Sequence, residues 1–245
     1  MPKVVCIVQA RTGSCRLPGK VLKSLAGRPL LAQLIDRLKA CAAYDRIVVA
    51  TTIDKRDDPV AELAQQVGVG IFRGDEEDVL SRYAGAAAES GAGVIVRVTG
   101  DCPLIDPVTS EATVRYFLSD DYDYAAAGVG GGFPRGLDTE VFTAAALFEA
   151  HELATDQASR EHVTYYLYTH PDRFKLAPEY QAPPALRRPG WRLCVDEEAD
   201  FRLITEIYNR LYRPGAIIDF RDVVRLLDRE PALAAINGNV AQKTV

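Results

Sequence analysis

The chain has 245 residues, of which 48% are hydrophobic and 26% charged, and its formal net charge is −5. These values are ordinary for a soluble globular protein and predict one large domain. The negative charge argues against general binding to nucleic acid or to anionic membranes, since both attract basic proteins.

Apolar strands and amphipathic helices alternate along the first half of the chain. After a strand at 4–8, the pattern predicts helices and strands in turn at 30–44, 46–52, 58–68, 70–74, 78–91 and 94–100. Asp58 is expected to be the N-cap of the helix that contains Pro59 and is closed by Gly68. This alternation predicts an α/β fold with a doubly wound, mostly parallel sheet.

The second half is less regular. The glycine-rich segment 128–138 has few side chains to pack, so we expect a mobile active-site loop there. Ser159 is expected to cap a helix, and Asp106 to cap another. The remaining predicted segments are a helix at 107–118, an apolar run at 122–128, a helix at 159–171, a proline-rich loop at 178–189, a strand at 191–196 and helices at 197–212 and 219–230. We expect a single domain over 1–230, with an insertion at 128–190 and a weakly ordered tail at 231–245.

Five cysteines occur without a CxxC pair. Three of them, Cys6, Cys41 and Cys194, lie in apolar patterns, where cysteine behaves as a small buried hydrophobe. The start of the chain does not resemble a signal peptide, and no apolar run reaches the length of a membrane span. We therefore expect a reduced, cytoplasmic location.

The loop after the first strand is the most informative part of the sequence. Its cations are Arg11, Arg16 and Lys20, and Gly13 and Ser14 lie between them. Open α/β sheets bind ligands at the carboxyl ends of their strands. Cations and exposed backbone N–H groups at that place suit a polyanion, most simply a triphosphate.

This loop is not a Walker A motif. Five residues separate Gly13 from Gly19, where Walker A has four, and Val21 follows Lys20 in place of a Ser or Thr. No GxGxxG follows the first strand either, which argues against a nicotinamide dehydrogenase.

Two carboxylates follow predicted strands that are far apart in the sequence. Asp101 comes after 94–100, and Asp196 ends 191–196. Side chains at the carboxyl ends of two strands could converge on one cation, and Mg²⁺ is usually held by one or two carboxylates together with phosphate oxygens. The alternative is that both are turn or cap residues. Glu197, Glu198 and Asp200 after Asp196 are read as a helix start that complements the helix dipole, and whether Asp200 joins the metal site stays open.

Two further clusters of residues give weaker indications of ligand contacts. Gly74 and Arg82 flank an acidic helix start at 75–78, and they could face a nucleobase or an anion. Residues 160–162 could contact a polar or acidic substrate, or form a solvated helix start. No HxxH or HExxH spacing occurs, so a zinc site is not expected.

Five segments together resemble the cytidylyltransferases of acidic sugars. That family includes CMP-3-deoxy-manno-octulosonate and CMP-sialic acid synthetases, and the likeness is greatest to its spore-coat polysaccharide biosynthesis branch. The segments are QARTGSCRLPGKVL (9–22), GDEEDVLSRY (74–83), VTGDCPLIDP (98–107), SREHVTYY (159–166) and LCVDEEADF (193–201). The resemblance implies a Rossmann-like sheet of the nucleotide-diphospho-sugar transferase type with a mixed β insertion. It also implies transfer of CMP from CTP to a sugar acceptor, release of pyrophosphate, and a homodimer.

The resemblance also implies roles for individual residues. The catalytic set would be Arg11, Arg16, Lys20 and Asp101, and Asp101 and Asp196 would bind Mg²⁺. The nucleotide would contact the triphosphate loop and the region around the third strand, at Ala10, Arg11, Gly13, Ser14, Arg16, Lys20, Gly74, Asp78 and Arg82. The sugar, and in part a dimer partner, would face Arg135, Glu140, Arg160, Glu161 and His162.

The chain departs from this family at one motif. Octulosonate synthetases commonly have Gln-Gly-Asp-Glu-Pro where residues 99–103 read Thr-Gly-Asp-Cys-Pro. The Asp is kept, so the metal site is expected and the acceptor sugar stays open. Two other functions also remain open: a sugar-1-phosphate nucleotidylyltransferase that uses another nucleotide, and a non-catalytic nucleotide-binding regulatory domain.

Overall fold

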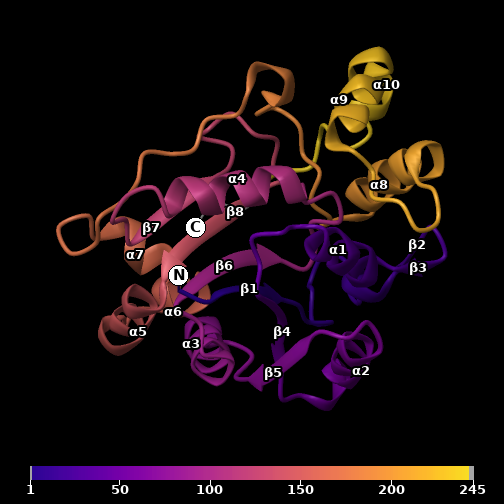
Figure 1. Ribbon diagram of the computed structural model, residues 1–245. Coiled ribbons are helices and arrows are strands. Elements are labelled where there is room, and N and C mark those ends of the chain that lie inside the picture. Colours follow the sequence, from indigo (N-terminus) through magenta and orange to yellow (C-terminus); the bar gives the residue numbers. More distant parts are fainter. Residues whose placement is uncertain (1, 243–245) are drawn as a thin grey trace.

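The computed structural model describes residues 2–242 and has a six-stranded sheet at its centre, with helices on both faces (Figure 1). The strand order in the sheet is β5-β4-β1-β6-β8-β7, and β2 and β3 form a small separate hairpin. In chain order the strands are β1 (Val4–Gln9), β2 (Ser24–Leu25), β3 (Arg28–Pro29), β4 (Arg46–Thr52), β5 (Gly70–Gly74), β6 (Val94–Thr99), β7 (Tyr124–Ala127) and β8 (Thr139–Thr143).

The helices follow the strands in the alternation that the sequence predicts for the first half. The α-helices are α1 (Leu30–Lys39), α2 (Asp58–Gln66), α3 (Val79–Ser90), α4 (Pro107–Phe117), α5 (Ala144–Leu153), α6 (Gln157–Glu161), α7 (Tyr165–Thr169), α8 (Glu198–Leu211), α9 (Phe220–Arg229) and α10 (Pro231–Ala234). Three short 3₁₀ helices are η1 (Lys20–Leu22), η2 (Lys55–Asp57) and η3 (Pro184–Leu186). Within residues 2–242, no helix is long and apolar enough to cross a membrane.

The central strand β1 is buried on both faces of the sheet. Its even-numbered side chains, such as Cys6, pack with α1, α2 and α4, whereas Val5 and Ile7 pack with α3 and α5. Near-continuous apolar strands of this kind are typical of parallel sheets covered by helices on both sides. The predicted α/β fold with a mostly parallel sheet is therefore confirmed, with β8 running antiparallel to both β6 and β7.

The register of the sheet brings three strand ends together. β1 pairs in parallel with β4 and with β6, and Gln9 at its end lies opposite Ala50 and Thr99. The segments that follow these three strands therefore begin at the same edge of the sheet. This edge is where the cationic loop and Asp101 meet.

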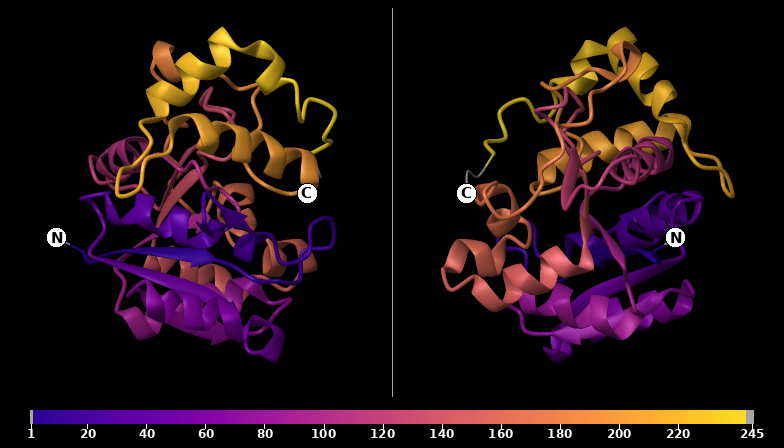
Figure 2. Two further views of the ribbon diagram at one scale, coloured as in Figure 1. Left: turned by 90° about the vertical axis from the view of Figure 1, so that its right-hand side faces the viewer. Right: turned by 60° about the vertical axis from the view of Figure 1, so that its left-hand side comes forward.

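A third apolar core joins the C-terminal helices to that edge. Side chains of α8 and α9 pack with Leu17 of the cationic loop, with Leu104 after β6, and with Leu193 and Val195 before α8. Figure 2 shows these helices as a separate layer, in yellow, at one end of the molecule. The layer fixes segments that are far apart in the sequence around a common point.

Two predicted elements of the second half are wrong. The helix predicted at 159–171 is two short helices, α6 and α7, and Asp156 rather than Ser159 caps α6. The chain leaves the helical path there because Val163 is buried and the Thr164 hydroxyl donates to Glu140 at 2.6 Å.

The strand predicted at 191–196 is extended but joins no sheet. Its N–H groups bind loop carbonyls, with Leu193 N bonded to Arg135 O and Val195 N to Asp101 O.

Other boundaries differ less. Helix α1 ends at Lys39 instead of residue 44, and Asp57 rather than Asp58 is the N-cap of α2. The sequence analysis does not predict strand β8 or helix α5. The C-terminal segment, predicted to be weakly ordered, contains α10 and the buried Asn237, and its last three residues, 243–245, lie outside the described residues.

The glycine-rich loop is packed, in contrast to the mobile loop that its composition predicts. Phe133 and Leu137 are fully buried. A Cβ atom added to Gly131 would lie 2.2 Å from the carbonyl oxygen of Tyr180. The absence of side chains therefore allows two backbone segments to approach closely, so the glycines have a packing role.

Gly131→Ala tests this packing. The added methyl group overlaps a backbone atom, and such overpacking typically costs about 1–3 kcal/mol. We expect a decrease of that size in the free energy of unfolding, measured by urea denaturation. Gly190→Ala is the matched control, because a Cβ at Gly190 meets nothing within 4 Å. Equal stability of the two variants would contradict a packed loop.

Candidate functional site

The loop after β1 has a defined shape. Gly19 N–H and Ser14 N–H both donate to the carbonyl of Thr12, at 2.9 Å each. Gly19 has φ of 67°, in the left-handed region that glycine adopts without strain, and this turn starts η1. As a result Lys20, the first residue of η1, points back toward the sheet edge.

Lys20 lies at the centre of the site. Its ammonium donates to Asp101 Oδ2 at 2.6 Å, to Asp196 Oδ1 at 2.8 Å and to the carbonyl of Val195 at 2.8 Å. The residue is only 8% exposed. Burial by itself would lower the pKa of Lys20, but the two carboxylates raise it above the ordinary value. The side chain is therefore a buried, charged ammonium.

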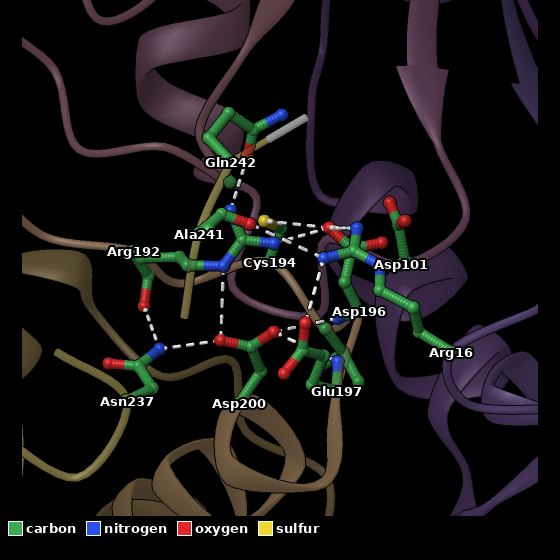
Figure 3. A network of polar contacts seen from close by, with 12 residues as sticks. Arg16, Asp101, Arg192, Cys194, Asp196, Glu197, Asp200, Asn237, Ala241 and Gln242 are labelled. Carbon is green, nitrogen blue, oxygen red and sulfur yellow. Dashed lines mark hydrogen bonds and ion pairs between the residues drawn. The ribbon is translucent and has the colours of Figure 1, made fainter. Parts of the chain in front are cut away.

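Asp196 accepts from three cations. Besides Lys20, its second oxygen, Oδ2, is bonded by Arg192 and lies 3.1 Å from Arg16 Nη2 (Figure 3). Burial would raise the pKa of Asp196, but Lys20 first, and then Arg16 and Arg192, hold it below its usual range. The carboxylate is therefore ionised at neutral pH, and this negative charge offsets much of the positive charge around it.

The two arginines of the loop, Arg16 and Arg11, each pair with a glutamate. Arg16 lies 3.1 Å from Glu197, and Arg11 lies 3.1 Å from Glu76. Each of the three cations that the sequence singles out thus has at least one acidic partner in this structure.

A pocket of about 320 Å³ opens over these groups. Of the predicted site residues, it is lined by Ala10, Arg11, Gly13, Ser14, Arg16, Lys20, Arg82, Asp101, Glu161, His162 and Asp196. Arg82 is 2% exposed, and its Nε is buried without a hydrogen-bond partner among the described residues. The pocket therefore presents cations and a carboxylate pair to one ligand.

Five predicted site residues lie outside this pocket. Gly74 ends β5 and packs against Phe72 and Arg82. Asp78 caps α3 by accepting from Ser81 N–H at 2.9 Å, and it also pairs with Arg160. Arg135 bridges to Arg192 in an isolated β-bridge.

Glu140, the fifth of these residues, belongs to a partly buried polar network. It forms an ion pair with Arg97 and accepts from Tyr124 and Thr164 hydroxyls at 2.6 Å each. Burial would raise the pKa of Glu140, but the Arg97 guanidinium keeps it below its usual range. Its partners Arg97 and Tyr124 belong to the sheet, and Thr164 lies just before α7, so the carboxylate connects these segments of the fold.

Sequence reasoning missed a residue that holds the cationic loop. Asp57 Oδ1 accepts from both the N–H and the hydroxyl of Thr12 at 2.7 Å, and its other oxygen accepts from Thr52. Burial would raise the pKa of Asp57, but these hydrogen bonds, Thr52 first, lower it. The Lys-Arg-Asp-Asp run at 55–58 gives no signal of this role, because Asp57 meets Thr12 only when β1 and β4 pair.

The chain is similar to known proteins over almost its whole length. The cytidylyltransferase family profile matches residues 5–218. An uncharacterized protein of Methanocaldococcus jannaschii is 41% identical over 99% of this chain and 97% of its own length. The spore coat polysaccharide biosynthesis protein SpsF of Bacillus subtilis is 33% identical, over 96% of this chain and 98% of its own. A solved cytidylyltransferase of Leptospira borgpetersenii superposes with a TM-score of 0.89 at 29% identity, over 100% of both chains.

Glu140→Ala separates a structural role of this residue from a role at the pocket. It leaves the partly buried Arg97 without its counter-ion, and breaking a shielded pair in this way costs up to about 3–5 kcal/mol. We expect that loss in the free energy of unfolding by urea denaturation. In the control Glu161→Ala, an exposed carboxylate at the pocket is removed, and stability should stay within about 0.5 kcal/mol. Unchanged stability of Glu140→Ala would refute the structural assignment.

Proposed function

Since the chain belongs to the cytidylyltransferase family, we propose that it transfers the cytidylyl group of CTP to a sugar hydroxyl and releases pyrophosphate. One observation carries the proposal: Lys20, Asp101 and Asp196 meet at one point of the pocket, beside the arginines of the loop after β1. The body of the protein is acidic, with a net charge of −5. A local group of cations on such a body favours a small polyanion over an extended one such as nucleic acid.

The cations of the loop bind the triphosphate in this proposal. Arg16 and Lys20 now neutralise carboxylates, and phosphate oxygens are acceptors of the same kind. Binding therefore exchanges one set of anionic partners for another, and the cations are already held at the pocket before the nucleotide arrives. Arg82 also lines the pocket, so its guanidinium adds a further positive charge beside the nucleotide.

The carboxylate pair fits a divalent cation. Asp101 and Asp196 already share one cation, the Lys20 ammonium, and among the described residues Asp101 Oδ1 has only the Cys102 thiol at 3.5 Å. Across the described chain no three His, Cys, Asp or Glu side chains form a metal-binding group. Two carboxylates completed by substrate phosphates are the donor set that Mg²⁺ prefers. A bound Mg²⁺ would supply charge neutralisation at the phosphates, and Asp101 and Asp196 would hold it.

The reaction forms one P–O bond and breaks another. The acceptor hydroxyl oxygen attacks the α-phosphorus, the bond from that phosphorus to the pyrophosphate oxygen breaks, and the hydroxyl proton is released. Negative charge grows on the α-phosphate and on the leaving pyrophosphate. Lys20 and Arg16, fixed by η1 and by the loop, stabilise this charge without reorganising.

The acceptor side of the pocket contains Glu161 and His162, from the end of α6. A polar pair of this kind suits a hydroxyl-rich sugar, and we propose an acidic sugar used for surface polysaccharide. The B. subtilis relative named for spore coat polysaccharide biosynthesis supports this pathway. A homodimer and a cytoplasmic location complete the proposal.

Nucleotide preference tests the proposed function. We expect pyrophosphate release from CTP, and not from ATP, GTP or UTP, when Mg²⁺ and a panel of acidic sugars are present. The same assay with sugar 1-phosphates is the comparison arm. Release from UTP or GTP with a sugar 1-phosphate would identify a different nucleotidylyltransferase. If the protein binds CTP but releases pyrophosphate with none of the acceptors in the panel, it is a non-catalytic nucleotide-binding domain.

Asp101→Asn tests the carboxylate pair. The substitution preserves size and an oxygen acceptor for Lys20 but removes the charge. We expect the turnover number to fall by roughly 10²–10³, the scale of losing one important electrostatic contact. Asp120→Asn, at an exposed carboxylate paired with Lys175, is the control and should leave turnover unchanged. Turnover near that of the wild type in a folded Asp101→Asn protein would remove Asp101 from the site.

A further inference from the structure

Behind Asp196 lies a chain of polar contacts that reaches the C-terminal segment (Figure 3). Arg192 bonds Asp196 Oδ2 with one guanidinium nitrogen, and its Nε donates to Asp200 Oδ1 at 3.1 Å. Asn237 Nδ2 then donates to the same Asp200 oxygen at 2.7 Å and to the carbonyl of Arg192 at 2.9 Å. The orientation of Asp196 is thus linked to a residue 41 positions later in the chain.

Asp200 is the buried centre of this chain. Its side chain is 0% exposed, and its Oδ2 accepts from the N–H groups of Asp196 at 2.9 Å and Glu197 at 3.0 Å. The carboxylate therefore has four donors: two backbone amides, one guanidinium and one side-chain amide. A buried carboxylate is tolerated when its acceptor positions are satisfied in this way. Its hydrogen bonds fix both the backbone and, through Arg192, the side chain of Asp196.

Asn237 is buried, although it lies in the C-terminal segment that the sequence predicts to be weakly ordered. It is 4% exposed, although Asn239, two residues later, is exposed. Its two hydrogen bonds hold both the backbone of Arg192 and the Asp200 carboxylate that orients the Arg192 guanidinium. Arg192 is itself only 10% exposed at its side chain, so few other positions are open to it. One support of the Arg192–Asp196 contact thus comes from the segment after α10.

We infer that Asn237, acting through Asp200 and Arg192, positions the Asp196 carboxylate for the metal–nucleotide complex. The inference rests on the proposed function and adds a positioning residue to it. Loss of the outer hydrogen-bond partners of a metal-binding carboxylate typically lowers metal affinity about 10–100-fold. Asn237 does not line the pocket, and its hydrogen bonds go to Arg192 and Asp200, so its effect is expected in affinity more than in the chemical step.

Asn237→Ala is the main test, with Asn239→Ala as the matched control. We expect the Mn²⁺ affinity of the full-length protein with CTP, measured by electron paramagnetic resonance, to fall about tenfold in Asn237→Ala and to stay unchanged in Asn239→Ala. The Mg²⁺ concentration for half-maximal turnover should rise by the same factor, and saturating Mg²⁺ should restore the turnover number. A purely structural role would lower the melting temperature without shifting either metal titration, and this result would overturn the inference.

Arg192→Lys provides a second test that leaves Asn237 in place. A lysine keeps the charge but lacks the planar fork that reaches Asp196 and Asp200 together. We expect a similar shift in the Mn²⁺ titration, and Arg210→Lys, at an exposed pair with Glu206, should cause none. An unchanged Arg192→Lys titration would overturn the link. Wild-type protein that neither binds Mn²⁺ with CTP nor releases pyrophosphate would instead refute the proposed function itself.

Discussion

The structure of the site depends on one buried ammonium. Lys20 connects the loop after β1 with Asp101 after β6 and with Asp196 before α8, through contacts of 2.6 and 2.8 Å. Three segments separated by 81 and 95 residues are thereby fixed at one point of the sheet edge. Because the charge is buried, it requires both carboxylates, and the carboxylates in turn require a cation. A nucleotide with its metal has to enter this arrangement by replacing partners of the same charge.

The rest of the molecule keeps these partners in register. Parallel pairing of β1 with β4 and β6 brings three strand ends to one edge, where Asp57 holds the cationic loop through Thr12. From the other side, the C-terminal layer packs on the same loops, and Asp200 fixes the start of α8. The Asp196 carboxylate lies where these two supports meet. Precision at the site is therefore shared between the sheet and a layer formed by the last part of the chain.

Local sequence patterns predict the first half of the fold well and the second half poorly. Strands such as β1 and β6 are short, apolar and bounded by turns, so their identity depends on nearby residues alone. The extended run before Asp196 has the same apolar pattern, but its N–H groups bind the carbonyls of Arg135 and Asp101, which no local pattern reveals. The glycine-rich loop has the composition of a mobile segment, although its glycines allow close backbone packing. Both of these features depend on a partner that is distant in the sequence.

The sequence by itself determined the chemical groups of the site: a loop with three cations after the first strand, two distant aspartates and a motif order that resembles one enzyme family. These features are local in the chain, and residue type and spacing suffice to recognise them. Only the tertiary structure decided which groups meet. It paired Lys20 with both aspartates, placed Glu140 in a network with Arg97, and connected Asn237 to Asp196 through Asp200 and Arg192. Contacts of this kind arise from strand register and from the packing of the C-terminal layer, and neither is encoded in a short segment.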